Sequence, residues 1–408
     1  MLPRTISSSL KQAIRTFPAL ILTGPRQSGK TTLLKNLFGT THSYVSLEDP
    51  DQQDYAKTDP RGFLGRLKMP VILDEIQYVP ELLSYIKSAI DNHRDPGQWL
   101  ITGSQNFALM QGVGESLAGR AAVFSLLPLS VAEIAKQGST SLSPTSWLEN
   151  FDKFNRPAIP TLNLSKLLLR GGYPEPSLQL AVDRNFWCGS YIATYLERDI
   201  RNLKQVGDLG QFQTFLRICA TRTGQILDIT GLASDVGVSH TTAKRWLSLL
   251  EASHQVYLLY PYYKNIGKRL VKRPKLYFVD TGLATYLMGL HSSEVLLSSP
   301  YFGPLFETFV IIDTLKRFYN RGLSPTLYYL RTPDKLEIDL VIELEGRLHL
   351  IEIKGVQTIF SKFGSNLLRL KKELKQQIKT IALISNTDHS SPLPHETINR
   401  SWKDTLIL

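Results

Sequence analysis

The chain has 408 residues, of which 42% are hydrophobic and 20% charged, and its net charge is +11. This size favours two or three globular domains of ~100–200 residues each. No stretch approaches the ~20 apolar residues of a membrane span, and the distant pair Cys188 and Cys219 excludes a zinc site and a disulfide framework. We therefore expect a cytoplasmic protein with no membrane contact, and the positive charge favours an anionic partner such as a nucleotide or nucleic acid.

Residues 1–135 alternate short apolar, β-rich runs with helical patterns. The predicted strands are 19–24, 43–47, 70–75, 99–104 and 121–129. Strands that alternate with helices predict an α/β domain with a parallel sheet covered on both faces.

The first strand runs directly into "GPRQSGKTT", which matches the G-x-x-x-x-G-K-[ST] pattern and opens a helix. In this context the glycines let backbone N–H groups surround phosphates at a helix N-terminus. Lys30 is expected at the β- and γ-phosphates and Thr31 on Mg²⁺, which makes ATP and Mg²⁺ the predicted cofactors. The expected nucleotide-binding residues are Gly24, Pro25, Arg26, Gln27, Ser28, Gly29, Lys30, Thr31 and Thr32.

Three further positions complete a predicted ATPase site. "VILDE" ends in Asp74, expected to hold Mg²⁺ through water, and Glu75, expected to polarise the attacking water. Ser104 or Gln105, after the next strand, is expected to sense the γ-phosphate. Arg120 is a candidate arginine finger or sensor, and its action in trans would require the homo-oligomer that we expect.

These motifs resemble a known family. "ILTGPRQSGKTT", "VILDEIQ", "ITGSQ" and "SLAGRAAVFSLLPLS" are similar to the AAA-type P-loop ATPase domain of a prokaryotic family whose C-terminal region is called DUF4143. "LLRGGYPEP" and "YIATYLERDIRNL" resemble the start of that C-terminal region. The resemblance implies ATP binding, a winged helix and a nuclease-like terminal domain.

A polar linker at 136–164 precedes a helical region at 165–290, within which 228–280 has the plan of a winged helix-turn-helix. Ser239 is expected to cap the second helix, which carries Lys244 and Arg245. A basic run at 262–276, which begins with Tyr262 and Tyr263, follows it. Such a run is suited to phosphate contacts, although a winged helix also serves protein contacts. The expected DNA-facing residues are Lys244, Arg245, Lys264, Lys268, Arg269, Lys272 and Arg273, and Lys275 belongs to the same basic run.

Residues 300–408 return to mixed α/β, with a helix at 305–318 and strands at 336–344 and 347–355. This order resembles the core of PD-(D/E)xK nucleases, which have the restriction-endonuclease-like fold. The resemblance implies a Mg²⁺ site at Glu307, Asp339, Glu352 and Lys354, with Glu337 as an alternate ligand. The alternatives are a hairpin with a charged solvent face and a DNA-binding module that does not cut.

Three functions follow from these patterns. The first is an ATP-hydrolysing AAA-type ATPase that binds DNA, with branched or recombining structures as candidate targets. The second is a regulatory ATPase switch that acts through protein partners. The third is an ATP-regulated, Mg²⁺-dependent DNA nuclease.

Overall fold

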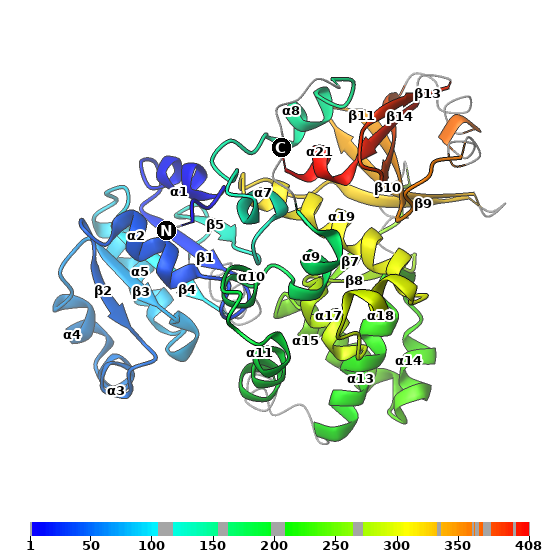
Figure 1. The fold of residues 1–408 in the computed structure, drawn as a ribbon. Helices are drawn as coiled ribbons and strands as arrows, with labels where there is room; N and C mark the ends of the chain where they lie inside the picture. The colour runs from blue at the N-terminus through cyan, green and yellow to red at the C-terminus, as the bar shows by residue number, and fades with distance from the viewer. Residues whose placement is uncertain are drawn as a thin grey trace. The chain divides into compact units, whose positions relative to one another are not determined.

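The computed structural model describes residues 2–104, 117–153, 162–196, 209–263, 272–332, 336–360, 363, 367–369, 377–394 and 397–407. Contacts between residues divide the chain into two units (Figure 1). The first unit comprises Met1–Pro128, Ala252–His254 and Tyr319–Leu323. The second comprises Leu129–Glu251, Gln255–Phe318 and Ser324–Leu408.

The first unit contains a five-stranded parallel sheet with the strand order β2-β3-β4-β1-β5. Its strands are β1 (Ala19–Thr23), β2 (Ser43–Ser46), β3 (Val71–Asp74), β4 (Trp99–Gly103) and β5 (Ala121–Ser125). All five predicted strands and their parallel arrangement are confirmed. Because the strands are parallel, the segments that follow β1, β3 and β4 meet at the same edge of the sheet.

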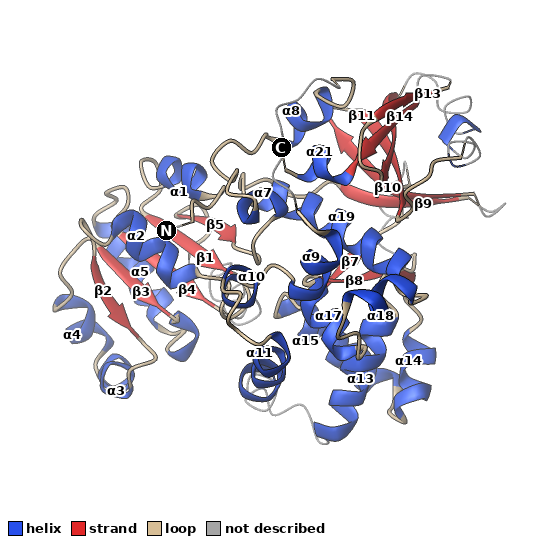
Figure 2. Cartoon of the chain, in the orientation of Figure 1, coloured by secondary structure: helices blue, strands red, loops and turns tan. Residues whose placement is uncertain are grey.

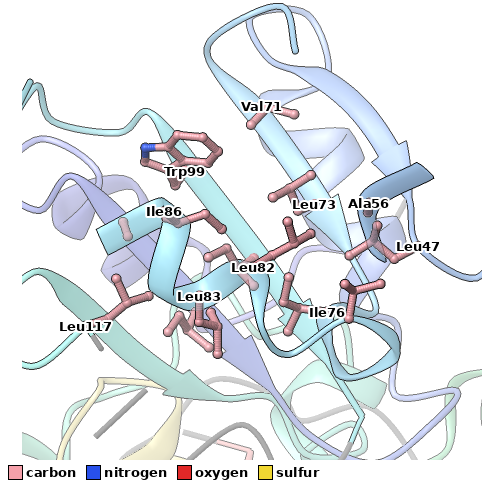
Figure 3. Packing of buried hydrophobic residues seen from close by; sticks show 14 of the residues in the cluster. Leu47, Ala56, Val71, Leu73, Ile76, Leu82, Leu83, Ile86, Trp99 and Leu117 are labelled. Carbon is pink, nitrogen blue, oxygen red and sulfur yellow. The ribbon is translucent and has the colours of Figure 1, made fainter. Parts of the chain in front are cut away.

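Both faces of this sheet are covered, since consecutive strand residues point to opposite sides. On one face, Leu20, Leu22 and Ile72 pack with residues of α1 and α2. On the other face, Ala19, Ile21 and Leu73 belong to a cluster that includes Leu82 and Ile86 of α5, part of which Figure 3 shows. The helices are α1 (Ser7–Ala13), α2 (Lys30–Phe38), α3 (Pro50–Thr58), α4 (Pro60–Gly65), the 3₁₀ turn η1 (Ile76–Tyr78) and α5 (Leu82–Asn92).

The second unit begins with helices (Figure 2). They are α7 (Val131–Ile134), α8 (Pro144–Glu149), α9 (Leu164–Arg170), α10 (Pro174–Leu178), α11 (Arg184–Tyr191), the π-helix η2 (Ile192–Leu196), α13 (Leu209–Thr221), α17 (Thr281–Leu287), α18 (Ser293–Ser298) and α19 (Phe302–Tyr319). Helix α19 confirms the helix expected at 305–318. The segment expected to be a linker contains α8, whose Ser143 caps it by accepting a hydrogen bond from the N–H of Ser146 at 3.2 Å.

Two helices joined by a tight turn lie within this unit, namely α14 (Ile229–Val236) and α15 (His240–Ala252). Gly237 has φ 75°, which suits a glycine at a helix end. The expected cap is present, since Ser239 Oγ accepts from the N–H of Thr242 at 3.1 Å. Strands β6 (Gln225–Ile226), β7 (Val256–Leu259) and β8 (Lys275–Phe278) form an antiparallel sheet in the order β6-β8-β7. Residues 229–278 of this arrangement are called the α14–β8 segment below.

The C-terminal sheet has six strands in the order β13-β14-β12-β11-β10-β9. They are β9 (Leu327–Arg331), β10 (Glu337–Leu344), β11 (Arg347–Lys354), β12 (Ile378–Ser385), β13 (Ser391–Leu393) and β14 (Thr397–Ser401), followed by α21 (Trp402–Leu406). Strands β9, β10 and β11 are antiparallel, whereas β11, β12 and β14 are parallel. A two-residue turn joins β10 to β11 through Glu345 and Gly346, which both have positive φ, as a type I′ hairpin loop requires.

No helix in the described part of the chain is both long enough and apolar enough to cross a membrane. The sequence also predicts a basic helix at 366–379, most of which lies outside the described residues.

Candidate functional site

The loop after β1 has the conformation that a phosphate-binding loop needs. Gly24 has φ 140° and Gly29 has φ 93°, and a Cβ at Gly24 would lie 2.2 Å from the carbonyl oxygen of Leu126. Only glycine therefore fits at position 24. Lys30, which is buried, donates to the carbonyl oxygens of Gly24 and Pro25 at 3.0 Å. Its ammonium group thus lies within the curve of the loop.

Arg4 supports this loop from the N-terminal segment. Its guanidinium donates to the carbonyl oxygen of Ser28 at 2.9 Å and to that of Leu127 at 2.8 Å. The sequence motifs did not identify Arg4, because its hydrogen-bond partners are backbone oxygens of residues that lie 24 and 123 positions away.

Asp74 forms the centre of a hydrogen-bond network at the carboxyl edge of the sheet. The hydroxyl of Thr31 donates to both of its carboxylate oxygens at 2.9 Å, and the hydroxyl of Tyr44 donates to Oδ2 at 2.8 Å. Thr102 donates to Oδ1 and accepts from the N–H of Glu75 at 3.0 Å. Burial and Asp74 raise the pKa of Tyr44 to about 12, so Tyr44 acts as a donor at neutral pH. Tyr44 and Thr102 were not among the predicted site residues.

Thr31 and Asp74 fit the Mg²⁺ ion that accompanies a nucleotide. Such an ion takes few protein oxygens and completes its octahedral shell with phosphate oxygens and water. A hydroxyl and a carboxylate in direct contact are a suitable pair of donors. We expect these two residues to hold the ion, with the Asp74 contact running through water.

Glu75 directly follows β3 with φ 59°, an unusual left-handed conformation for a residue with a side chain. Its carboxylate accepts from the amide of Gln77, which also donates to Ser104 Oγ at 2.9 Å. The structure thus brings Glu75 and Ser104 together through Gln77, a residue that the motif did not single out. The alternative sensor, Gln105, lies outside the described residues.

Arg120 lies at the amino-terminal ends of β1 and β5, opposite the strand ends that carry the phosphate-binding loop. It precedes β5, and its carbonyl oxygen accepts from the N–H of Ala19 at the start of β1 at 3.2 Å. Five residues of strand, about 17 Å, separate this edge from the phosphate-binding loop. The guanidinium pairs with Asp91 at 2.6 Å. Within one chain, Arg120 therefore lies too far from the phosphate-binding loop to reach a nucleotide there, and its described ion pair is with Asp91.

The second unit contains a cluster of acids on α19, β10 and β11. The structure brings together the residues that the nuclease-like pattern predicted, and it adds one from β8. The acid cluster consists of Glu307, Glu337, Asp339, Glu352, Lys354 and Lys275. Lys354 Nζ lies 2.7 Å from Glu352 Oε1 and 3.3 Å from Asp339 Oδ2. The backbone N–H of Ile353 also donates to Asp339 Oδ2 at 2.8 Å.

Lys275 was expected to face phosphates, and this expectation is wrong. Its side chain is only 4% exposed, and Nζ lies 2.6 Å from Glu337 Oε1, 3.1 Å from Glu307 Oε1 and 3.9 Å from Asp339 Oδ1. Position 275 begins β8, a strand whose four residues are all buried, so a side chain on either face of the strand lies inside the protein.

Burial and crowding of like charges change the protonation of this cluster. Burial, followed by the charge of Asp339, raises the pKa of both Glu307 and Glu352. Burial alone would lower the pKa of Lys275, but Glu307, Asp339 and Glu337 raise it above its ordinary value. Lys275 is therefore charged at neutral pH, whereas the two glutamates hold protons more strongly than glutamates in water.

The acid cluster does not fit a divalent metal ion. In the described residues, no three His, Cys, Asp or Glu side chains are arranged to hold a metal. Glu352 Oε2 is buried without a hydrogen-bond partner, but the facing oxygens of Glu307, Glu337 and Asp339 are directed to an ammonium group. A divalent ion would need several of these same oxygens.

The other basic residues predicted to contact DNA divide into two sets. Lys244 and Arg245 on α15 are exposed, and so are Lys272 and Arg273 just before β8. Lys264, Lys268 and Arg269 lie outside the described residues. The described basic residues thus lie at the protein surface, but their positions alone do not identify a partner.

Comparisons with known proteins agree with the geometry of the first unit. A family model described as an AAA domain matches residues 16–135. Domains of unknown function match 161–294 (DUF8612) and 302–402 (DUF4143). A protein of Mycobacterium tuberculosis, "Uncharacterized protein Rv2008c", is 31% identical over 395 residues, which cover 96% of this chain and 81% of that protein. This chain belongs to the AAA-type P-loop ATPases with a DUF4143 region.

Within this family, "Uncharacterized protein Mb2031c" of Mycobacterium bovis shows the same identity and coverage. The segments 168–176 and 191–203 fall in the DUF8612 match, so the DUF4143 region begins later than the resemblance indicated. Among solved structures, a Walker-type ATPase of Pyrococcus abyssi is 15% identical, covering 70% of this chain and 96% of that one, with a TM-score of 0.46. The Thermotoga maritima RuvB Holliday junction branch migration motor is 18% identical, covering 62% and 86%, with a TM-score of 0.30.

Proposed function

We propose that this AAA-type P-loop protein hydrolyses ATP with Mg²⁺ and binds DNA through the α14–β8 segment, acting as a winged helix, and through a nuclease-like C-terminal domain. The observation that carries the ATPase part is the meeting of Lys30, Thr31, Asp74 and Glu75 at one edge of the sheet. These residues supply a phosphate-binding ammonium group, a Mg²⁺ site and a carboxylate for the attacking water.

In this reaction, the loop around Gly24 and Gly29 holds the phosphates, and Lys30 neutralises charge that develops on the β- and γ-phosphates. When bound, Mg²⁺ draws negative charge from the phosphate oxygens. Glu75 accepts a hydrogen bond from the attacking water and orients it toward the γ-phosphorus. Gln77 and Ser104 fix the direction of the Glu75 carboxylate.

The DNA part of the proposal is supported by charge and position. The net charge of +11 favours an anionic partner, and exposed Lys244 and Arg245 lie on the helix that would enter a groove. Exposed Lys272 and Arg273 lie beside the strand pair that would form the wing. Without an amide side chain to read bases beside Lys244 and Arg245, we propose binding to DNA shape more than to sequence.

The test of the ATPase is steady-state ATP hydrolysis without DNA and with single strands, duplex or a four-way junction. Lys30→Ala is expected to abolish hydrolysis, because the phosphates lose their principal cation. Hydrolysis that persists in purified Lys30→Ala protein would refute the proposed site. Strong stimulation by one DNA form would identify the preferred structure.

The test of DNA binding is charge reversal at Lys244 and Arg245. Lys244→Glu/Arg245→Glu is expected to weaken DNA binding at least tenfold and to reduce the slope of affinity against salt concentration. The matched control is Lys57→Glu/Arg61→Glu, an equal change of charge at exposed positions in the first unit. Equal DNA affinity in the two variants would contradict a DNA-binding role for α15.

The same measurements separate the other two functions. Slow hydrolysis that is indifferent to every DNA would favour a regulatory switch with protein partners. A nuclease requires cleavage of DNA with Mg²⁺ or Mn²⁺ and ATP on a denaturing gel, and that cleavage must disappear in Glu352→Ala.

A further inference from the structure

The acid cluster contains a cation that the chain itself supplies. Lys275 Nζ contacts carboxylates from two elements at once, with Glu307 on α19 and with Glu337 and Asp339 on β10. One cation surrounded by carboxylates from separate elements is also the arrangement of a divalent metal site. Here the position is occupied by a buried ammonium group.

Tyr277 strengthens this arrangement from the same strand. Its hydroxyl donates to Glu307 Oε1 at 2.5 Å. Lys275 and Tyr277 are two residues apart on β8, so their side chains lie on the same face of that strand. Strand β8 thus provides both donors that hold Glu307.

Backbone contacts near the cluster join the same two regions. The N–H of Tyr262 donates to the carbonyl oxygen of Tyr329 on β9 at 2.6 Å, and the N–H of Tyr329 donates to that of Tyr260 at 3.1 Å. The Tyr329 hydroxyl donates to the carbonyl oxygen of Arg273 at 2.7 Å. The sheet of the α14–β8 segment is therefore attached to the C-terminal sheet on the side where Lys275 enters.

We propose that Lys275 takes the place of a divalent cation in the acid cluster, which makes the cluster a metal-free ionic centre that fixes β8 to the C-terminal sheet. A buried ammonium group within hydrogen-bond distance of two carboxylates and close to a third satisfies the charge that would otherwise attract a metal. This inference depends neither on ATP hydrolysis nor on DNA binding.

The test is Mn²⁺ uptake by the full-length, nucleotide-free protein, measured as loss of the free-ion electron paramagnetic resonance signal. Wild-type protein and its Asp339→Asn variant are expected to take up equal amounts, because the cluster contributes no site. Mn²⁺ uptake by wild-type protein that Asp339→Asn removes would overturn the proposal. This comparison needs no change at Lys275, so it remains decisive if a Lys275 variant does not fold.

A second experiment removes the Lys275 ammonium group from the acid cluster. Lys275→Met removes the charge but keeps an unbranched apolar chain, and it is expected to take up one Mn²⁺ per chain more than wild-type protein. The added site must disappear in Lys275→Met/Asp339→Asn. Lys166→Met, at an exposed position on α9 outside the acid cluster, is the matched control and should take up Mn²⁺ as wild type does. A folded Lys275→Met protein that gains no Mn²⁺ would also overturn the proposal.

Discussion

Tyr44 is a residue whose role the structure adds to the phosphate-binding site. Its hydroxyl contacts Asp74, and the ammonium group of Lys35 lies 3.4 Å from the centre of its ring. Both contacts hold Tyr44 against the carboxylate that serves Mg²⁺. Tyr44 therefore acts as a positioning residue, one step away from the nucleotide.

We predict that Tyr44→Phe lowers kcat for ATP hydrolysis about tenfold, because a hydrogen bond to a charged group contributes about 1.5 kcal/mol. The KM for ATP should change less, since the phosphate-binding loop is unaltered. Tyr85→Phe on α5 removes a hydroxyl outside the site and serves as the control. Equal kcat values for the two variants would show that the Tyr44 hydroxyl does not position Asp74.

Glu352 gives a prediction about pH. Its pKa is raised in the folded protein by burial and by Asp339, so folding favours the protonated form. Stability is then present at low pH and declines as the pH rises from the ordinary glutamate value of ~4.3 through the raised folded value. The decline amounts to about 1.4 kcal/mol for each unit of upward shift.

Glu352→Gln removes this titration. The melting temperature of the variant, relative to that of wild type, should therefore become more favourable as the pH is raised from 5 to 8. Thermal unfolding monitored by circular dichroism at several pH values measures this difference. A difference that stays constant, or that falls with pH, would show that Glu352 is ionised without cost in the folded protein.

Sequence features that span only a few neighbouring residues predicted most of the strands and helices named above. The apolar runs predicted all five strands of the first sheet, and Ser239 predicted the start of α15, because both depend on residues close in sequence. The pattern did not predict η2 or the burial of Lys275. Lys275 pairs with Glu307 and Glu337, which lie 32 and 62 residues away in the sequence. A pattern of neighbouring residues cannot predict a pairing over that separation.

The contribution of the N-terminal cap of α15 to stability can be tested by mutation. We predict that Ser239→Ala lowers the free energy of unfolding by about 1 kcal/mol, because the N–H of Thr242 loses its acceptor. Urea denaturation followed by circular dichroism measures the change. Ser248→Ala, within the same helix, should cost less than half as much, since alanine is the better helix former there. A larger effect at Ser248 would argue against the cap.

The position of Arg120 concerns whether copies of this chain act together. Its guanidinium lies at the sheet edge opposite the phosphate-binding loop, so it can serve a nucleotide only on a neighbouring copy of the chain. The homo-oligomer expected from the sequence stays a prediction, and Arg120 provides the means to test it. The sequence offers Arg120 as a candidate arginine finger, and the sheet register adds that it lies far from the phosphate-binding loop of its own chain.

We predict that Arg120→Ala reduces ATP hydrolysis at least a hundredfold, and that mixing it with inactive Lys30→Ala restores part of the activity. In the mixture, an intact Arg120 from one copy can meet an intact Lys30 from another. Hydrolysis rates at a series of mixing ratios measure this complementation. Full activity of Arg120→Ala alone would exclude the arginine finger, and absence of recovery would exclude sharing between copies.

The placement of Lys275 has a consequence for how this chain can be divided. Family models separate residues 161–294 from 302–402, but the cation that neutralises Glu307, Glu337 and Asp339 lies in the first of these stretches. A fragment that begins at residue 302 would leave these carboxylates without Lys275 and Tyr277. The second stretch therefore depends on the first for its charge balance: a gene fusion that carried the second stretch alone into another protein would need a new cation for these acids.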